Sequence, residues 1–141
     1  MGEVYDVTAG KEFYDVGEGY SFFAGRDGTV SFFTGDYDPD HIGDKKVLDF
    51  TGPEIMSMEQ WRQFYEDHEV YRFLGVLDGE YYDKNGKETP YLLKIREKVT
   101  IAKVEVEIEE RKRKEKLEER RKMRLEKQKA AEAEKAKADE L

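Results

Sequence analysis

The aromatic residues of this chain all lie in its first 96 residues, and this limits what each part can fold into. All 17 Phe and Tyr residues and the single Trp precede Glu97. Residues 1–96 hold 10 basic and 20 acidic side chains, whereas residues 97–141 hold 15 basic and 13 acidic ones. Because a hydrophobic core needs large apolar side chains, we expect one domain over residues 1–96 and a charged, solvated tail over residues 97–141.

The front part has the pattern of a small α+β domain. The alternating residues 3–7 and 70–77 indicate two strands. Frequent glycines in residues 11–36 leave room only for short helical turns. Asp78-Gly79 and Asn85-Gly86 indicate two tight turns after the second strand.

One helix in this part has a clear start. Thr51 precedes an apolar repeat, and Glu54 follows three residues later, which is the spacing of a capping box. One face of this helix is therefore expected to lie against a core. The apolar residues of that face are Ile55, Met58, Trp61 and Phe64 or Tyr65.

The tail is expected to be helical, because Glu, Lys, Arg and Ala dominate it and no Gly or Pro follows Pro90. Ile101, Val104 and Ile108 are expected to pack back on the domain. Further along, large apolar residues are too sparse for a coiled coil, so the helix is either solvated or docks along a protein partner. Opposite charges recur four residues apart, and each pair adds a few tenths of a kcal/mol. The pairs are Glu107/Arg111, Glu109/Arg113, Glu110/Lys114, Lys114/Glu118, Glu118/Lys122 and Lys122/Glu126.

Composition also excludes several classes of function. The acidic front part argues against a nucleic-acid partner, which requires clustered Lys and Arg. No apolar run approaches the roughly 18–20 residues that span a bilayer. The chain has no cysteine, which rules out disulfides and thiolate metal sites.

No enzyme motif is present, and the protein is expected not to be an enzyme. His41, in a polar loop over residues 36–46, and His68, after the capped helix, are expected to be surface residues, because neither has a distinctive ligand partner. The glycine-rich stretch GEGYSFFAG lacks the Lys-Ser/Thr that holds a nucleotide and its metal.

An aromatic cluster remains as the candidate site. Buried tyrosines need partners for their hydroxyls, so several together predict a flat apolar cavity with polar contacts, suited to a planar ligand. The alternative is that these rings are only core. The cluster comprises Phe13, Tyr14, Tyr20, Phe22, Phe23, Phe32 and Phe33.

The residues VYDVTAGKEFYDVGEGYSFFAGRDGTVSFFTGDY, the helix EIMSMEQWRQFYE and the strand YRFLGVL resemble the membrane-associated progesterone receptor family. The resemblance covers roughly residues 3–93. It implies a cytochrome b5-like heme/steroid-binding domain, with heme b as the cofactor. Family domains normally begin about two dozen residues earlier, with a further strand and helix, so the sequence is expected to lack that segment.

The resemblance also implies the site residues. Tyr20 matches the tyrosine that ligates the heme iron in the family, and Tyr14 and Tyr71 match two further pocket tyrosines, with Phe23 beside them. A tyrosinate is an anionic axial ligand that suits ferric iron. A lysine often found before the third tyrosine is Val70 here, which removes a contact to a heme propionate.

Two functions follow as hypotheses. The first is a heme-binding module, which also has room for a steroid or another lipophilic ligand, acting in binding, sensing or partner recruitment. The second is a heme-free adaptor whose tail helix docks into an assembly. A peroxidase-like use of the open heme face ranks third, because no distal histidine has a recognisable position.

The C-terminal residues Ala138 to Leu141, ADEL, resemble the tetrapeptide that retrieves proteins to the endoplasmic reticulum. They predict the endoplasmic reticulum lumen or the secretory pathway as the location, with the cytoplasm as the alternative.

Overall fold

The computed structural model describes residues 1–38 and 46–140. The expectations for Pro39, His41 and Gly43 of the polar loop, and for the terminal Leu141, fall outside the described residues. The chain divides into two compact units, Met1–Lys103 and Val104–Leu141. This division lies seven residues beyond the one expected from composition.

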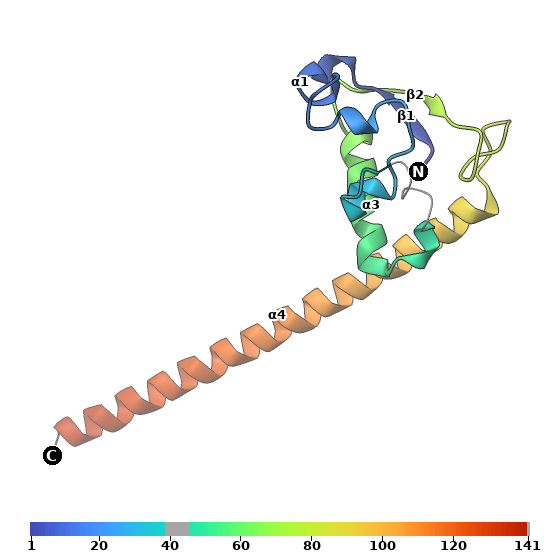
Figure 1. Ribbon diagram of the computed structural model, residues 1–141. Helices are drawn as coiled ribbons and strands as arrows, with labels where there is room; N and C mark the ends of the chain where they lie inside the picture. The colour runs from blue at the N-terminus through green and yellow to red at the C-terminus, as the bar shows by residue number, and fades with distance from the viewer. Residues whose placement is uncertain (39–45, 141) are drawn as a thin grey trace. The chain divides into compact units, whose positions relative to one another are not determined.

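The first unit is an α+β structure with a two-stranded antiparallel sheet, which confirms the α+β part of the predicted fold class. Strand β1 (Glu3–Asp6) pairs with β2 (Arg72–Val76), so segments about 70 residues apart in the sequence lie side by side (Figure 1). The register places Glu3 opposite Val76 and Asp6 opposite Arg72, with an irregularity between Val4 and Tyr5. Both strands lie within the ranges that the alternating residues predict.

Between the strands, the glycine-rich region folds into single turns, as predicted. A positive φ at Gly17, Gly25 and Gly35 reverses the chain between turns. The turns are η1 (Thr8–Gly10), α1 (Lys11–Tyr14), η2 (Ser21–Phe23) and α2 (Ser31–Thr34), and a further turn, η3 (Val47–Asp49), follows residue 46. Helix α2 ends directly at Gly35, whereas α1 and η2 end at the extended residues Asp15 and Ala24, shortly before Gly17 and Gly25.

Helix α3 (Gly52–Glu66) begins as its sequence predicts. The backbone N–H of Thr51 donates to Glu54 Oε2 at 2.7 Å, so the capping box is formed. Ile55 and Met58 are buried. The same face continues into Trp61 and Tyr65, which are half-buried, while Phe64 is exposed.

Helix α4 (Pro90–Asp139) runs for 50 residues, which confirms the predicted long helix. Its buried residues are Leu92, Ile95, Val99 and Ala102. Three residues were expected to pack on the domain: Ile101 and Val104 are instead about half exposed (52% and 49%), whereas Ile108 is partly buried. The prediction was wrong for Ile101 and Val104 because the helix already begins at Pro90, and Leu92 and Ile95 set which face is buried.

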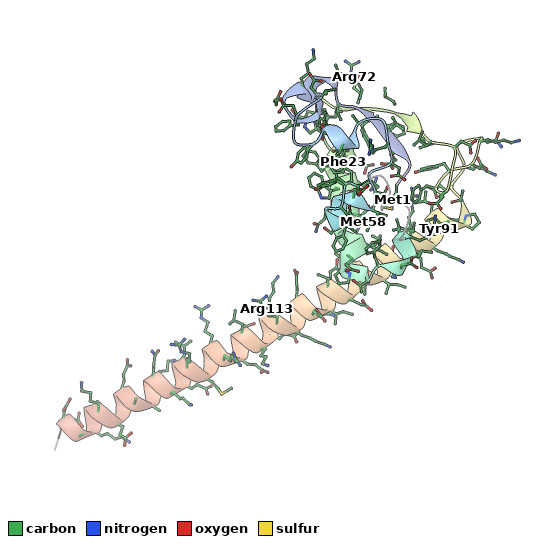
Figure 2. All side chains as sticks on the ribbon, viewed as in Figure 1. Met1, Phe23, Met58, Arg72, Tyr91 and Arg113 are labelled. Carbon is green, nitrogen blue, oxygen red and sulfur yellow. The ribbon has the colours of Figure 1, made fainter. Side chains whose placement is uncertain are left out.

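The core of the first unit joins η3, α3, the segment between β2 and α4, and the start of α4. Met58 lies among the crowded side chains of this unit (Figure 2). Ala102 packs closely on the first turn of α3, because a Cβ at Gly52 would come within 2.9 Å of the Ala102 Cβ. The buried hydrophobic cluster consists of Val47, Phe50, Ile55, Met58, Tyr81, Tyr82, Leu92, Ile95 and Val99.

The second unit is the continuation of α4, and its side chains from 109 to 139 are exposed. Of the six charge pairs predicted for the tail, only Glu118 and Lys122 come within 4.0 Å, at 3.8 Å, among the residues described. Within the described part of the chain, no helix is both long and apolar enough to cross a membrane.

Candidate functional site

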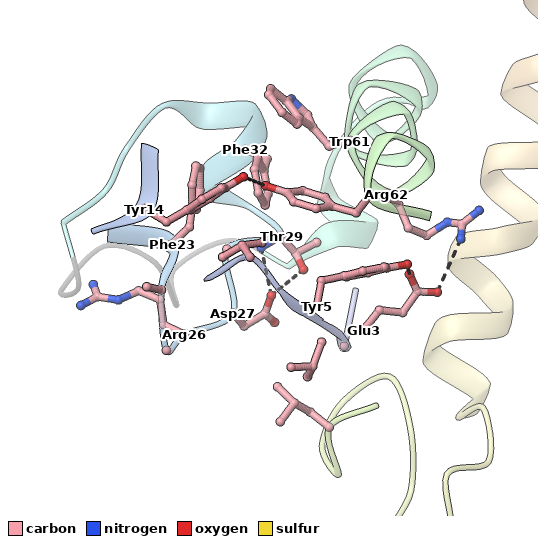
Figure 3. A pocket seen from close by; sticks show the side chains of 18 of the residues that line it. Glu3, Tyr5, Tyr14, Phe23, Arg26, Asp27, Thr29, Phe32, Trp61 and Arg62 are labelled. Atoms are coloured by element: carbon pink, nitrogen blue, oxygen red, sulfur yellow. Dashed lines mark hydrogen bonds and ion pairs between the residues drawn. The ribbon is translucent and has the colours of Figure 1, made fainter. Parts of the chain in front are cut away.

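A cavity of about 690 Å³ lies in the first unit, within the range of small-molecule sites. Strand β1 and the residues just after it line the cavity, together with residues 23–29, the middle of α3, and Leu74 and Leu77 (Figure 3). The two paired strands form one side of the cavity. The pairing of β1 with β2 brings Leu74 and Leu77 next to the N-terminal residues that also line it.

Stacked aromatic rings form one wall of the cavity. The ring of Phe23 stacks on Phe32, with centroids 4.0 Å apart and an interplanar angle of 14°. Phe32 in turn lies 5.1 Å from the ring of Trp61. Residues from η2, α2 and α3 thus meet in one apolar surface, which suits a flat apolar molecule.

Two phenols form a hydrogen-bonded pair at the same wall. The hydroxyls of Tyr14 and Tyr65 are 2.6 Å apart (Figure 3). Burial raises the pKa of Tyr65, and its hydrogen bond to Tyr14 raises that pKa further. Burial also raises the pKa of Tyr14, partly offset by the same hydrogen bond. Both phenols are therefore neutral at pH 7, and since one donates to the other, the second keeps an O–H for a ligand.

A charged network forms another side of the cavity. Tyr5 Oη donates to Glu3 Oε2 at 3.1 Å, and Arg62 Nη1 lies 3.5 Å from Glu3 Oε1. Arg62 also pairs with Glu59 at 2.8 Å and with Glu66 at 2.9 Å, which fixes its guanidinium. Burial, helped by the Glu3 carboxylate, raises the pKa of Tyr5 to about 12. Strand β1 and helix α3 are thereby joined across the cavity.

The four site residues expected from the sequence lie close together. Tyr14 and Phe23 line the cavity. The ring of Tyr20 lies 6.1 Å from Tyr14 and 6.0 Å from Phe23, but Tyr20 is 41% exposed and does not line the cavity. Tyr71 does not line it either, and its ring lies 5.9 Å from that of Tyr14. The cofactor-binding roles of all four residues, and iron ligation by Tyr20, stay predictions.

The Arg-Asp pair after the aromatic stretch holds a turn. Asp27 Oδ1 accepts hydrogen bonds from the backbone N–H of Thr29 at 2.9 Å and from its hydroxyl at 2.5 Å. Arg26 and Asp27 both line the cavity. The Asp27 carboxylate therefore stabilises the segment 23–29 that borders the cavity.

Sequence reasoning missed several lining residues. Trp61 and Tyr65 belong to the α3 face that the apolar spacing identified as core, and Tyr5 lies on the predicted strand β1. The aromatic residues of that face were the available signal, because ligand sites are lined largely by hydrophobic and aromatic side chains. Whether the aromatic face of α3 packs in the core or lines a cavity depends on which other elements lie against it. The spacing of the apolar residues does not contain this information.

His68 has a structural role in the turn before β2. Its Nδ1 accepts hydrogen bonds from the backbone N–H groups of Val70 and Tyr71, both at 3.2 Å, and its ring stacks on Tyr71 at 3.8 Å. Within residues 1–38 and 46–140, no three His, Cys, Asp or Glu side chains gather as a group that could hold a metal ion.

The chain is similar in sequence to several known proteins. No protein-family model and no solved structure matches the chain. Curated relatives do match. They include a neuferricin homolog of Drosophila pseudoobscura pseudoobscura, 39% identical over 113 residues, which are 76% of this chain and 38% of that protein. The neuferricin of Mus musculus is 39% identical over 100 residues, 71% of this chain and 37% of that protein.

A plant protein extends the group. The membrane-associated progesterone-binding protein 4 of Arabidopsis thaliana is 39% identical over 92 residues, 65% of this chain and 36% of that protein. The chain thus spans less than two fifths of the length of each of these relatives. The stretch FLGVLDGEYYDKNGKETP, residues 73–90, predicts similarity to neuferricins in particular, with the neudesins more distant, and the neuferricin part is confirmed. Over its aligned part, the chain belongs to the neuferricin and membrane-associated progesterone receptor family.

Proposed function

We propose that residues 1–103 form a cytochrome b5-like module that binds heme in the aromatic cavity, with Tyr20, beside the cavity, as the residue that would hold the iron. The observation that carries the proposal is an aromatic cavity of about 690 Å³ with the cluster Tyr14, Tyr20 and Tyr71 at its edge. Membership of a family that includes a protein named as progesterone-binding supports a flat hydrophobic ligand of this kind.

The residues present fit such a group. Stacked Phe23, Phe32 and Trp61 offer an apolar wall for a macrocycle. The lining residues include no histidine, so the iron would take an oxygen donor, and the phenol of Tyr20 beside the cavity is one such donor for ferric iron. Tyr20 is in ring contact with two of the lining residues, Tyr14 and Phe23.

Each residue then has a separate task. Heme, when bound, supplies a ferric iron that accepts a tyrosinate oxygen. The backbone N–H of Tyr20 donates to Phe13 O at 2.8 Å, which fixes the start of η2 and with it the position of the phenol. Tyr14, held by Tyr65, supplies a hydroxyl beside that phenol. Tyr71, held by the His68 stack, packs against Tyr14 and limits how far its ring can turn.

A steroid or another lipophilic molecule is the alternative ligand of the same cavity. The O–H that the Tyr14–Tyr65 pair retains is a donor for a ligand carbonyl, and the aromatic wall suits a flat ring system. In either case the module acts by binding, in sensing or partner recruitment, and not as an enzyme.

A heme titration followed by visible absorption tests the proposal. Wild type should develop a Soret band, and Tyr20→Phe should remain folded but lose it, because the ring stays and the ligand oxygen goes. Tyr14→Phe and Tyr71→Phe should weaken binding by roughly 10–100-fold, as neighbours of a ligand do. Tyr37→Phe, which changes an exposed tyrosine outside the lining residues, is the control. Equal affinities in all five proteins would end the Tyr20 assignment, and no Soret band in wild type would favour the heme-free adaptor.

A further inference from the structure

The charges of α4 between residues 111 and 129 are sorted onto two faces. This segment holds eleven Lys and Arg and four Glu, a net charge of +7. At 100° per residue, the four glutamates fall within an arc of about 100°, and the remaining arc of about 260° contains only basic, apolar and amide side chains. All of these side chains are exposed.

A row of like charges runs from one edge of the acid-free arc to its center. Lys112, Lys116, Arg120 and Arg124 follow one another at intervals of four residues, and we call this row the basic face. Arg120 and Arg124 have no carboxylate three or four residues away in either direction. The ion pair of this segment, Glu118 with Lys122, lies on the opposite face.

Such a row opposes helix formation. Like charges at i and i+4 destabilise an isolated helix by a few tenths of a kcal/mol per pair, and the basic face contains three such pairs in series. Interspersing the four glutamates among the bases would remove this repulsion without changing the net charge. A partner with many negative charges would also remove it.

We propose that the basic face of α4 binds an anionic lipid surface. A flat surface is contacted by one side of a straight helix, and the acid-free arc extends over one side. Leu117 and Met123 lie within this arc and are 68% and 55% exposed. Two apolar side chains among bases can enter the lipid interface, whereas phosphate groups of a nucleic acid offer them nothing. Clusters of four to eight Lys and Arg on a helix are typical of binding to anionic lipids.

The full-length chain is tested by co-sedimentation with phosphatidylcholine vesicles that contain or lack phosphatidylserine. Wild type should bind the anionic vesicles, more weakly as salt is raised, and should not bind the neutral ones. The triple variant Lys116→Gln, Arg120→Gln, Arg124→Gln should lose binding by on the order of 100-fold, since each basic residue near the surface contributes about one factor of five.

The matched control is Arg111→Gln, Lys122→Gln, Lys129→Gln, which removes the same charge from the face that carries the glutamates. It should lose less than about 10-fold, because those side chains lie on the far side of a helix about 10 Å wide. Far-UV circular dichroism verifies that both variants stay helical.

Equal losses in the two variants would show that net charge alone acts, and would overturn the proposal. Displacement of the protein from vesicles by a DNA or RNA duplex at equal phosphate concentration would overturn the choice of lipid. Because no step involves the cavity, failure here leaves the heme proposal unaffected.

Discussion

Residues 90–103 and residues 104–139 belong to one continuous helix, yet different interactions hold them in that conformation. The first segment buries Leu92, Ile95, Val99 and Ala102 in the core of the first unit. The second segment has no buried residue and relies on helix propensity and local charge pairs. The comparison shows that a helix can pass from tertiary to purely local stabilisation without a break in its backbone.

The largest expected difference between the segments comes from removing a buried side chain. Ile95→Ala should lower the free energy of unfolding of the first unit by about 2–5 kcal/mol, because Ile95 is fully buried and its loss leaves a cavity. Leu117→Ala, in the exposed segment, should change it by less than about 0.5 kcal/mol. Urea unfolding followed by the fluorescence of Trp61, the only tryptophan, measures both. Similar losses would mean that the second segment is also packed.

Enlarging a small residue should also affect the two segments differently. Ala102→Leu should destabilise the first unit by about 1–3 kcal/mol through overpacking, because Gly52 leaves no space beside the Ala102 Cβ. Ala130→Leu on the exposed segment is the control, and it should have little effect. The same fluorescence measurement applies. A neutral Ala102→Leu would indicate that α3 and α4 can move apart at no cost.

The alkaline stability of the first unit should depend on Tyr5. Its pKa is raised to about 12 when folded, against about 10 in an unfolded chain. The folded state therefore favours the neutral phenol, and this stabilisation is present below pH 10 and lost as the pH rises to about 12. Tyr5→Phe should show a shallower fall in the free energy of unfolding over that range than wild type. Tyr37→Phe, at an exposed position, should follow wild type. If Tyr5→Phe does so too, neither burial nor the Glu3 contact affects the titration of Tyr5.

The smallest effects should appear in a peptide of residues 104–139. Glu118→Gln removes the one ion pair of the tail and should lower helicity, whereas Arg120→Gln relieves the like-charge row and should raise it, each by a few tenths of a kcal/mol. Far-UV circular dichroism at low salt measures both, and the two changes should converge as salt screens the charges. Helicity that depends on peptide concentration would instead mean that the tail self-associates.

The predictable parts of the fold are those with local causes. The start of α3 followed from Thr51 and Glu54, the short turns of residues 11–36 from their glycines, and the helical tail from its composition. The buried face of α4 was not predictable in the same way. Ile101 and Leu92 are both apolar, and only the position of the core distinguishes the exposed one from the buried one.

The candidate site also has features that follow from the sequence and features that follow only from the tertiary structure. The sequence by itself determined the chain's family, the concentration of aromatic residues in its front part, and the sorting of charge along the tail, because these are properties of residue type and spacing. Only the tertiary structure decided that Tyr14 meets Tyr65 across 51 positions, that Glu3 meets Arg62 across 59, and that Tyr20 stands beside the cavity. The physical reason is that these contacts depend on how β1, β2 and α3 close on one another, and short-range spacing carries no information about that closure.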